Sequence, residues 1–366
     1  MNRINYMAIL LLLMGVMLPV QEMIGCTSMI VSGRVSASGK PLLWKHRDTG
    51  TEHNFVERVS RPGEYAYVAL FNGGDSLLRE AWMGMNDRGF AIMNTASYNL
   101  APDTAKVKDR EGIVMSRALA VCRTVEDFST LLDTLPKPLG VQANFGVIDA
   151  EGDGAYFETD DYTYKIYKLQ DSETGVLIRT NFSLSGNDTD GMGYIRYDNA
   201  RYLTQQAVAG HSLTPAHFTE LCSRSFYHSM LEKDCAWDTT VRWVVDQDFI
   251  PRYSSSASIV IEGCLPGEFD NNYIMWTTLG YPPVSHVEKV TIDEVPRALR
   301  PTAEGWRAPA CNNAIEFKRK AFPVQRGSGK RYIDMDYLRA KSNDECDLSF
   351  KNYKMHYQIN KSVQNK

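Results

Sequence analysis

The sequence lacks several features that would decide a function class at once. Its net charge is only −4 and its Lys and Arg residues are scattered, so no basic surface for nucleic acid is expected. Its seven His residues have no metal-ligand spacing, and no papain-like motif surrounds any cysteine. Internal repeats and low-complexity tracts are absent as well. These absences predict a globular protein without a nucleic-acid partner, and they imply no metal and no cofactor.

Long hydrophobic runs are nearly absent too. The one that occurs, from Ala8 to Val20, is shorter than the about 20 residues that a helix needs to cross a bilayer. Arg3 precedes it, and a short polar step follows it before Gly25 and Cys26. This order is typical of a secretory signal. We therefore predict a signal peptide over residues 1–25 and export to the periplasm or the extracellular space.

Cysteine is sparse for an exported chain of this size. Outside the cytoplasm disulfides can form, and setting Cys26 aside leaves an even six. Cys222 with Cys235 and Cys311 with Cys346 are pairings that the sequence leaves open.

What the chain does have is the composition of a soluble globular protein. Its 366 residues are 43% hydrophobic and 23% charged, which is ample for a sizeable core. Beyond Pro301 the pattern weakens, and the run from Arg326 to Lys330 reads as a flexible break. We predict one domain over residues 26–325 and a polar C-terminal tail over residues 326–366.

Hydrophobic periodicity predicts the architecture of that domain. Strand patterns fill most of residues 27–94 and return over residues 144–179 and 256–278. Helical patterns lie over residues 114–135, 194–207 and 215–228. The order is sheet, helices, sheet, helices, sheet. Two antiparallel sheets stacked face to face with helices outside would bury this pattern, which is an α+β sandwich of four layers, αββα.

The residue with the clearest chemical potential is Cys26. If the chain is cut after Gly25, Cys26 carries a thiol and a free α-amine on one carbon. That amine, with a reference pKa of about 7.7–8.0, can take the thiol proton and later pass it to a leaving amine. An acceptor must hold the amine in place, and Asp48, at the end of the next predicted strand, is the natural candidate.

These residues carry a family resemblance. The chain resembles the N-terminal nucleophile (Ntn) cysteine hydrolases in one ordered pattern. Cys26-Thr27 opens a strand, a turn and a second strand follow, and a basic-x-x-Asp motif ends at Asp48. The chain is similar to their choloylglycine hydrolase and penicillin V acylase group, their acyl-coenzyme A:isopenicillin N acyltransferase group, and certain cysteine dipeptidases. The first eight residues from Cys26 are nearest the dipeptidases, whereas Asn181 after a strand fits the other groups better. The resemblance implies an αββα fold and cleavage of a linear amide bond without a cofactor.

Carried over position by position, the resemblance implies a set of site residues. Cys26 is the nucleophile, Asp48 orients the α-amine, and Asn181 gives a side-chain N–H to the oxyanion. Asn94 is a second polar group near the thiolate. Lys45 stands three residues before Asp48, where the family commonly has arginine, so the positive charge is kept and the bidentate fork is lost.

Many choloylglycine hydrolases carry an arginine in a Ser-Ser-rich strand late in the chain. The matching stretch of this chain, near Ser258, has no arginine. Arg252 is its nearest substitute, and we do not include it in the predicted site. Its loss makes bile-salt hydrolysis less expected and favours the acyltransferase-like branch. Trp82, Tyr98 and Trp276 could line an acyl pocket, although aromatic residues on strands more often belong to the core.

Other interpretations stay open at this point. Residues 23–26 also resemble a lipobox, in which Cys26 would be lipidated, lose its base and anchor a surface lipoprotein that only binds. Asp48 could merely cap a turn or form a salt bridge, and Asn94 could be structural. The enzyme could also be a cysteine dipeptidase. The expected partner is a small-molecule amide substrate, without a membrane unless Cys26 is lipidated, and a homo-oligomer is left open.

Overall fold

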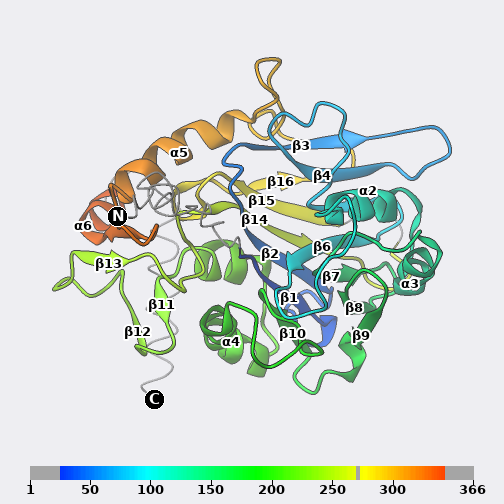
Figure 1. Ribbon diagram of the computed structural model, residues 1–366, viewed down its shortest axis with the longest axis horizontal. Helices are drawn as coiled ribbons and strands as arrows, with labels where there is room; N and C mark the ends of the chain where they lie inside the picture. The colour runs from blue at the N-terminus through cyan, green and yellow to red at the C-terminus, as the bar shows by residue number, and fades with distance from the viewer. Residues whose placement is uncertain (1–24, 269–272, 343–366) are drawn as a thin grey trace, which may run out of the picture.

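The computed structural model of the protein describes residues 25–268 and 273–342, and these form two large antiparallel sheets with helices on their outer sides (Figure 1). The predicted α+β class and its stacked, four-layer arrangement are therefore confirmed. The predicted signal peptide lies outside the described residues, apart from Gly25. In the described part of the chain, no helix is long and apolar enough to cross a membrane.

The six-stranded sheet contains the first described strand, β1, one place in from its edge. Its order is β10 (Val176–Arg179), β1 (Thr27–Val31), β2 (Leu42–Asp48), β14 (Ser255–Glu262), β15 (Ile274–Leu279) and β16 (Glu288–Val290). Side chains alternate between its two faces. Ile30 and Leu43 join the core between the sheets, while Met29 and Trp44 join the core on the outer face. Cys26, just before β1, is therefore flanked by strands on both sides.

The seven-stranded sheet is a meander whose strands follow chain order. It consists of β3 (Asn54–Val59), β4 (Tyr67–Asn72), β5 (Met83–Asn86), β6 (Ala91–Ala96), β7 (Ala143–Ile148), β8 (Gly154–Thr159) and β9 (Tyr164–Lys168). The predicted turn between β5 and β6 closes as expected, because Gly89 adopts a φ of 81° and donates to the carbonyl of Asn86. Helices α2 (Glu111–Val121) and α3 (Val125–Thr134) pack on this sheet, as the 114–135 periodicity predicts.

The opposite outer layer covers the six-stranded sheet. It contains α4 (Tyr194–Ala209; Figure 1) and η3 (His217–Cys222). Their apolar residues form one core with Met29 and Trp44. The predicted helix over residues 215–228 is shorter in the structure and gives way to a hairpin of β11 (Tyr227–His228) and β12 (Lys233–Asp234). The Ser225 hydroxyl explains this stop, because it accepts from the Tyr227 N–H and donates to the Asp234 carboxylate.

Residues 326–342 differ from the predicted polar tail. They contribute to a C-terminal lobe, which we define as α5 (Pro309–Ala321), β17 (Val324–Gln325), β18 (Arg331–Asp334) and α6 (Met335–Ser342). β18 pairs with β13 (Trp243–Val245), and Ile333, Met335 and Leu338 are buried in a third core with Phe322. The apolar residues of this lobe are scattered over short elements, so its hydrophobic periodicity is too weak to predict these elements from the sequence. Residues 343–366 lie outside the described part.

The cysteines that the structure describes are all free thiols. The pairing of Cys222 with Cys235 is therefore wrong: Cys222 lies in the core under α4, and Cys235 in the core of the C-terminal lobe. Cys311 is also free and donates to the Asn54 carbonyl, while Cys346 lies outside the described residues.

Candidate active site

Cys26 lies where the chain enters β1, and only 8% of its surface is exposed. β1 and β2 pair with Thr27 opposite His46, so the end of β2 runs beside the peptide that joins Gly25 to Cys26. The Cys26 Sγ is 3.9 Å from the Asp48 backbone carbonyl, which it contacts as a weak donor. The predicted neighbours Cys26 and Asp48 are thus brought together by one hairpin.

The Asp48 carboxylate is fully buried and held at both oxygens. Its Oδ1 accepts from the Ser255 hydroxyl at 2.6 Å, and its Oδ2 accepts from the Arg252 guanidinium. The same Arg252 Nη2 donates to the Gly25 carbonyl, so it bridges Asp48 and the peptide before Cys26. Burial lowers the pKa of Arg252, but the charge of Asp48, the hydrogen bond to it and the charges of Asp246 and Asp248 together outweigh burial, so the net shift is upward. Arg252, which sequence reasoning sets aside, therefore belongs to the site.

Ser255 is itself fixed by two further donors. Its Oγ lies 2.9 Å from the Arg252 backbone N–H and 2.8 Å from His46 Nε2. Burial lowers the pKa of His46 to about 4, so the ring is neutral at physiological pH. Because the Ser255 proton points to Asp48, these bonds assign the His46 proton to Nε2. Asp48 is thus held in one orientation by a hydrogen-bonded chain, which argues against a simple turn cap.

Asn181, just after β10, has its amide orientation set by an arginine. Its Oδ1 accepts from Arg196 Nη2 at 2.7 Å, and its Nδ2 donates to the Ala96 carbonyl at 2.8 Å. A guanidinium can only donate, so the atom facing it must be the oxygen. The Nδ2 then keeps one further N–H, the group that an oxyanion requires.

Arg196 also holds the nucleophile's own backbone. Its Nη1 donates to the Cys26 carbonyl at 2.5 Å and to the Thr27 hydroxyl at 3.0 Å. Burial, and secondly the charge of Arg252, lowers the pKa of Arg196 to about 9. Sequence reasoning missed this residue. One sequence pattern could have revealed Arg196. This residue lies at helical spacing with Ala200 and Leu203 on the buried face of α4, and a charged residue is unusual on such a face.

On the other side of Cys26, Lys45 and Asn94 form a contact between the two sheets. The Lys45 Nζ donates to Asn94 Oδ1 at 2.7 Å and to the Trp82 carbonyl at 2.8 Å. Burial lowers the pKa of Lys45 to about 7, opposed by the nearby Cys26 and reinforced by Arg47. Asn94 is therefore placed in the site as a partner of the Lys45 ammonium.

Arg47 supplies a second cation on the same face of β2. Its guanidinium donates to the side-chain oxygens of Asn54 and Asn72, and it lies 5.0 Å from the Trp82 ring centroid. Burial lowers the pKa of Arg47 to about 10, while the nearby Cys26 and Asp48 raise it. Lys45 and Arg47 therefore place two buried basic side chains near Cys26.

The aromatic residues divide between the two faces of the sheet. Trp82 contacts both cations of the site, and Tyr98 donates its backbone N–H to the Asn181 carbonyl at 3.2 Å. Burial, with the nearby Cys26 as second cause, raises the pKa of Tyr98 to about 12. Trp276 packs instead against the core under α4 with Trp44, which agrees with the core role expected more often of aromatic residues on strands.

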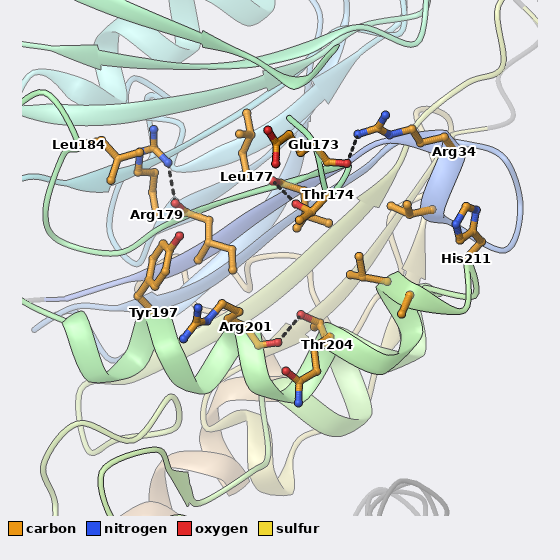
Figure 2. Close-up of a pocket in the computed structure, with 16 residues that line it drawn as sticks. Arg34, Glu173, Thr174, Leu177, Arg179, Leu184, Tyr197, Arg201, Thr204 and His211 are labelled. Carbon is orange, nitrogen blue, oxygen red and sulfur yellow. Dashed lines mark hydrogen bonds between the residues drawn. The ribbon is translucent and has the colours of Figure 1, made fainter. Parts of the chain in front are cut away.

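A cavity of about 680 Å³ lies next to the site without containing it. Figure 2 shows it between β10 and α4, with Leu177 on the strand and Tyr197 and Arg201 on the helix. Cys26 and Asp48 do not line it. β10 leads into Asn181 and α4 carries Arg196, so the cavity lies against the two elements that position these site residues.

The pKa of Lys45 leads to a stability prediction. Between about pH 7, its folded pKa, and 10.5, its unfolded value, the unfolded chain binds more protons than the folded one. This group therefore adds up to about 1.4 kcal/mol of unfolding free energy per pH unit as pH rises through that window. In a Lys45→Met variant this contribution is missing.

We expect the stability of the wild type relative to Lys45→Met to be lowest near pH 6.5 and to grow toward pH 9.5. Urea unfolding of both proteins at pH 6.5, 8 and 9.5 measures this difference. A difference that is constant with pH would show that the ammonium is not desolvated in the fold.

Known proteins were compared with this chain at the levels of sequence and structure. No family profile matches it, and no curated protein matches it by sequence. Among solved structures, an N-acylethanolamine-hydrolyzing acid amidase ortholog from Caenorhabditis elegans is similar, with 14% identity and a TM-score of 0.45. The similarity covers 67% of this chain and 96% of that one.

Two further solved structures are similar to a comparable degree. A mutant of conjugated bile acid hydrolase from Clostridium perfringens is 11% identical, with a TM-score of 0.45, over 74% of this chain and 93% of its own. Penicillin V acylase from Agrobacterium tumefaciens is 14% identical, with a TM-score of 0.42, over 74% and 87%. At such values the likeness says nothing of chemistry, so we base the function on the contacts around Cys26.

Proposed function

We propose that the protein is an Ntn cysteine amidohydrolase, whose working form begins at Cys26 and cleaves a linear amide C–N bond in a small molecule. The observation that supports this most is that a fixed carboxylate at Asp48, an oriented amide at Asn181 and a buried amine at Lys45 lie around the Gly25–Cys26 segment. A structural cysteine needs none of these groups.

The proposed reaction follows from their places. The Cys26 α-amine takes the thiol proton, and Sγ attacks the substrate carbonyl carbon. The carbonyl oxygen becomes an oxyanion, which the remaining N–H of Asn181 Nδ2 stabilises. As the C–N bond breaks, the α-ammonium returns the proton to the leaving amine and a thioester remains on Sγ. Water then attacks the thioester and releases the acid, or a second amine does so and receives the acyl group.

Activation of this enzyme requires cleavage after Gly25. In the described chain Gly25 lies inside the site, where Arg252 donates to its carbonyl. A Cβ on Gly25 would lie 2.6 Å from Asn181 Oδ1, 2.7 Å from Arg196 Nη2 and 2.9 Å from Arg252 Nη2, so any larger residue would have to displace these side chains. These contacts favour self-cleavage. Sγ attacks the Gly25 carbonyl carbon that Arg252 polarises, the Gly25–Cys26 C–N bond breaks as the thiol proton passes to the Cys26 nitrogen, and water then hydrolyses the thioester between Gly25 and Sγ.

A Gly25→Val variant tests this route. The valine side chain would clash with the site and displace the Gly25 carbonyl, so self-cleavage should slow by at least about 100-fold. The full chain, translated without signal peptidase, is followed by intact mass. We expect the wild type to convert to a form starting at Cys26 while Gly25→Val stays uncut. If neither is cut until signal peptidase is added, self-cleavage is refuted and the peptidase activates the protein.

The proposed function is tested by mass spectrometry and a substrate screen. Intact mass of the exported protein should begin at Cys26 with a free amine, and the purified protein should cleave penicillin V, conjugated bile salts or N-acyl amino acids. A preference for free-amine dipeptides would instead indicate the dipeptidase. A thioether-linked lipid on Cys26 with no thiol open to iodoacetamide would indicate the lipoprotein and overturn the enzyme.

A further inference from the structure

The two side chains that hold the Asp48 carboxylate come from one short segment, residues 246–255, which leads into β14. Within it, the Arg252 N–H donates to the Ser255 hydroxyl at 2.9 Å, and the Ser255 N–H donates back to the Arg252 carbonyl at 3.0 Å. Arg252 and Ser255 therefore move together. If this turn is displaced, both donors to Asp48 are displaced together.

The turn is clamped from outside the two-sheet sandwich through Tyr253. The guanidinium of Arg331, on β18, lies 4.0 Å from the centroid of the Tyr253 ring, and the Nζ of Lys318, on α5, lies 5.1 Å from it. The Phe322 ring meets the same ring edge-on at 5.5 Å. Such cation–π and edge contacts fix a ring in place.

Two hydrogen-bond connections run parallel to the Tyr253 contacts. Buried Asp246 accepts from the Tyr253 N–H at 3.0 Å, and its own N–H donates to the Arg331 carbonyl at 2.8 Å. Lys318 Nζ reaches the Ser255 carbonyl at 3.4 Å. The C-terminal lobe thus holds both ends of the segment that presents Arg252 and Ser255.

We propose that the C-terminal lobe is a positioning module of the active site, and that Tyr253 is the residue through which it fixes Arg252 and Ser255 against Asp48. Tyr253 is a positioning residue, because it acts only through its neighbours. The inference rests on the proposed function for the role of Asp48 in orienting the Cys26 α-amine.

The test compares Tyr253→Leu, Tyr253→Phe and a matched control, Tyr332→Leu. Tyr332 is half-buried in the same lobe and carries a similar cation, Arg326, at 5.4 Å from its ring. Two readouts are used on the mature protein: kcat for amide cleavage, and the rate at which iodoacetamide alkylates Cys26 at pH 7.5, which needs no substrate. We expect Tyr253→Leu to lower both by at least fivefold with KM unchanged, and the other two variants to stay within twofold of the wild type.

The proposal is overturned if Tyr253→Leu matches the wild type in both readouts, or if Tyr332→Leu loses as much as Tyr253→Leu does. If Tyr253→Leu does not fold, Arg331→Met removes the nearer cation and is judged by the same limits. If Tyr253→Leu slows the alkylation of Cys26 but the wild type cleaves no amide, the proposed function is refuted and this inference stands.

Discussion

Cys26→Ala is expected to lower kcat/KM for amide cleavage by about 10⁵-fold or more, because the group that forms the thioester is gone. Neighbouring donors such as Asn181 cannot replace a missing nucleophile. The same change removes the thiol that self-cleavage needs, so the variant should also keep residues 1–25. Activity of the purified variant and its intact mass are the two measurements.

Two controls separate catalysis from processing and from folding. Alkylating Cys26 in the mature wild type should abolish activity although the chain is already cut. Cys264→Ala, which removes another buried thiol in the core between the sheets, should keep wild-type activity. Activity that survives both Cys26→Ala and alkylation would place the chemistry elsewhere in the molecule.

The parts of the site that sequence predicted are those set by local structure. Cys26 directly precedes β1 and Asp48 ends β2, so the hairpin of these two strands brings them together whatever the rest of the chain does. Asn181 follows a strand, β10, that pairs directly with β1. Lys45 and Asn94 meet because their strands face each other across the inter-sheet core, which the four-layer prediction already requires.

The parts that sequence could not provide are buried charges from distant segments. Arg196 and Arg252 lie far from Cys26 in the chain, and no residue next to either of them in the sequence indicates its partner in the site. Their burial depends on partners such as Asp48 and Asn181, which only the tertiary structure supplies. The C-terminal lobe escaped prediction for a related reason: its strands are short, so few residues carry each pattern.

Asp48→Asn is expected to lower kcat/KM on the order of 10³-fold, within the range that a positioned acid–base group contributes. The amide keeps the shape of the carboxylate and loses its charge, so the Cys26 α-amine is no longer held by an anion. The buried Arg252 guanidinium also loses its counter-charge. Removing one partner of a buried ion pair costs about 3–5 kcal/mol of unfolding free energy.

A double-mutant cycle separates these two effects. Asp48→Asn with Arg252→Met removes both charges, so its loss of stability should be smaller than the sum of the single losses, by about 1–3 kcal/mol. Its activity should stay low, because no anion returns to the amine. Asp149→Asn, at a buried carboxylate that only binds backbone N–H groups near α3, should lower stability but leave kcat near the wild-type value. If Asp48→Asn keeps kcat/KM within threefold of the wild type, Asp48 does not orient the catalytic amine, and its burial with Arg252 is purely structural.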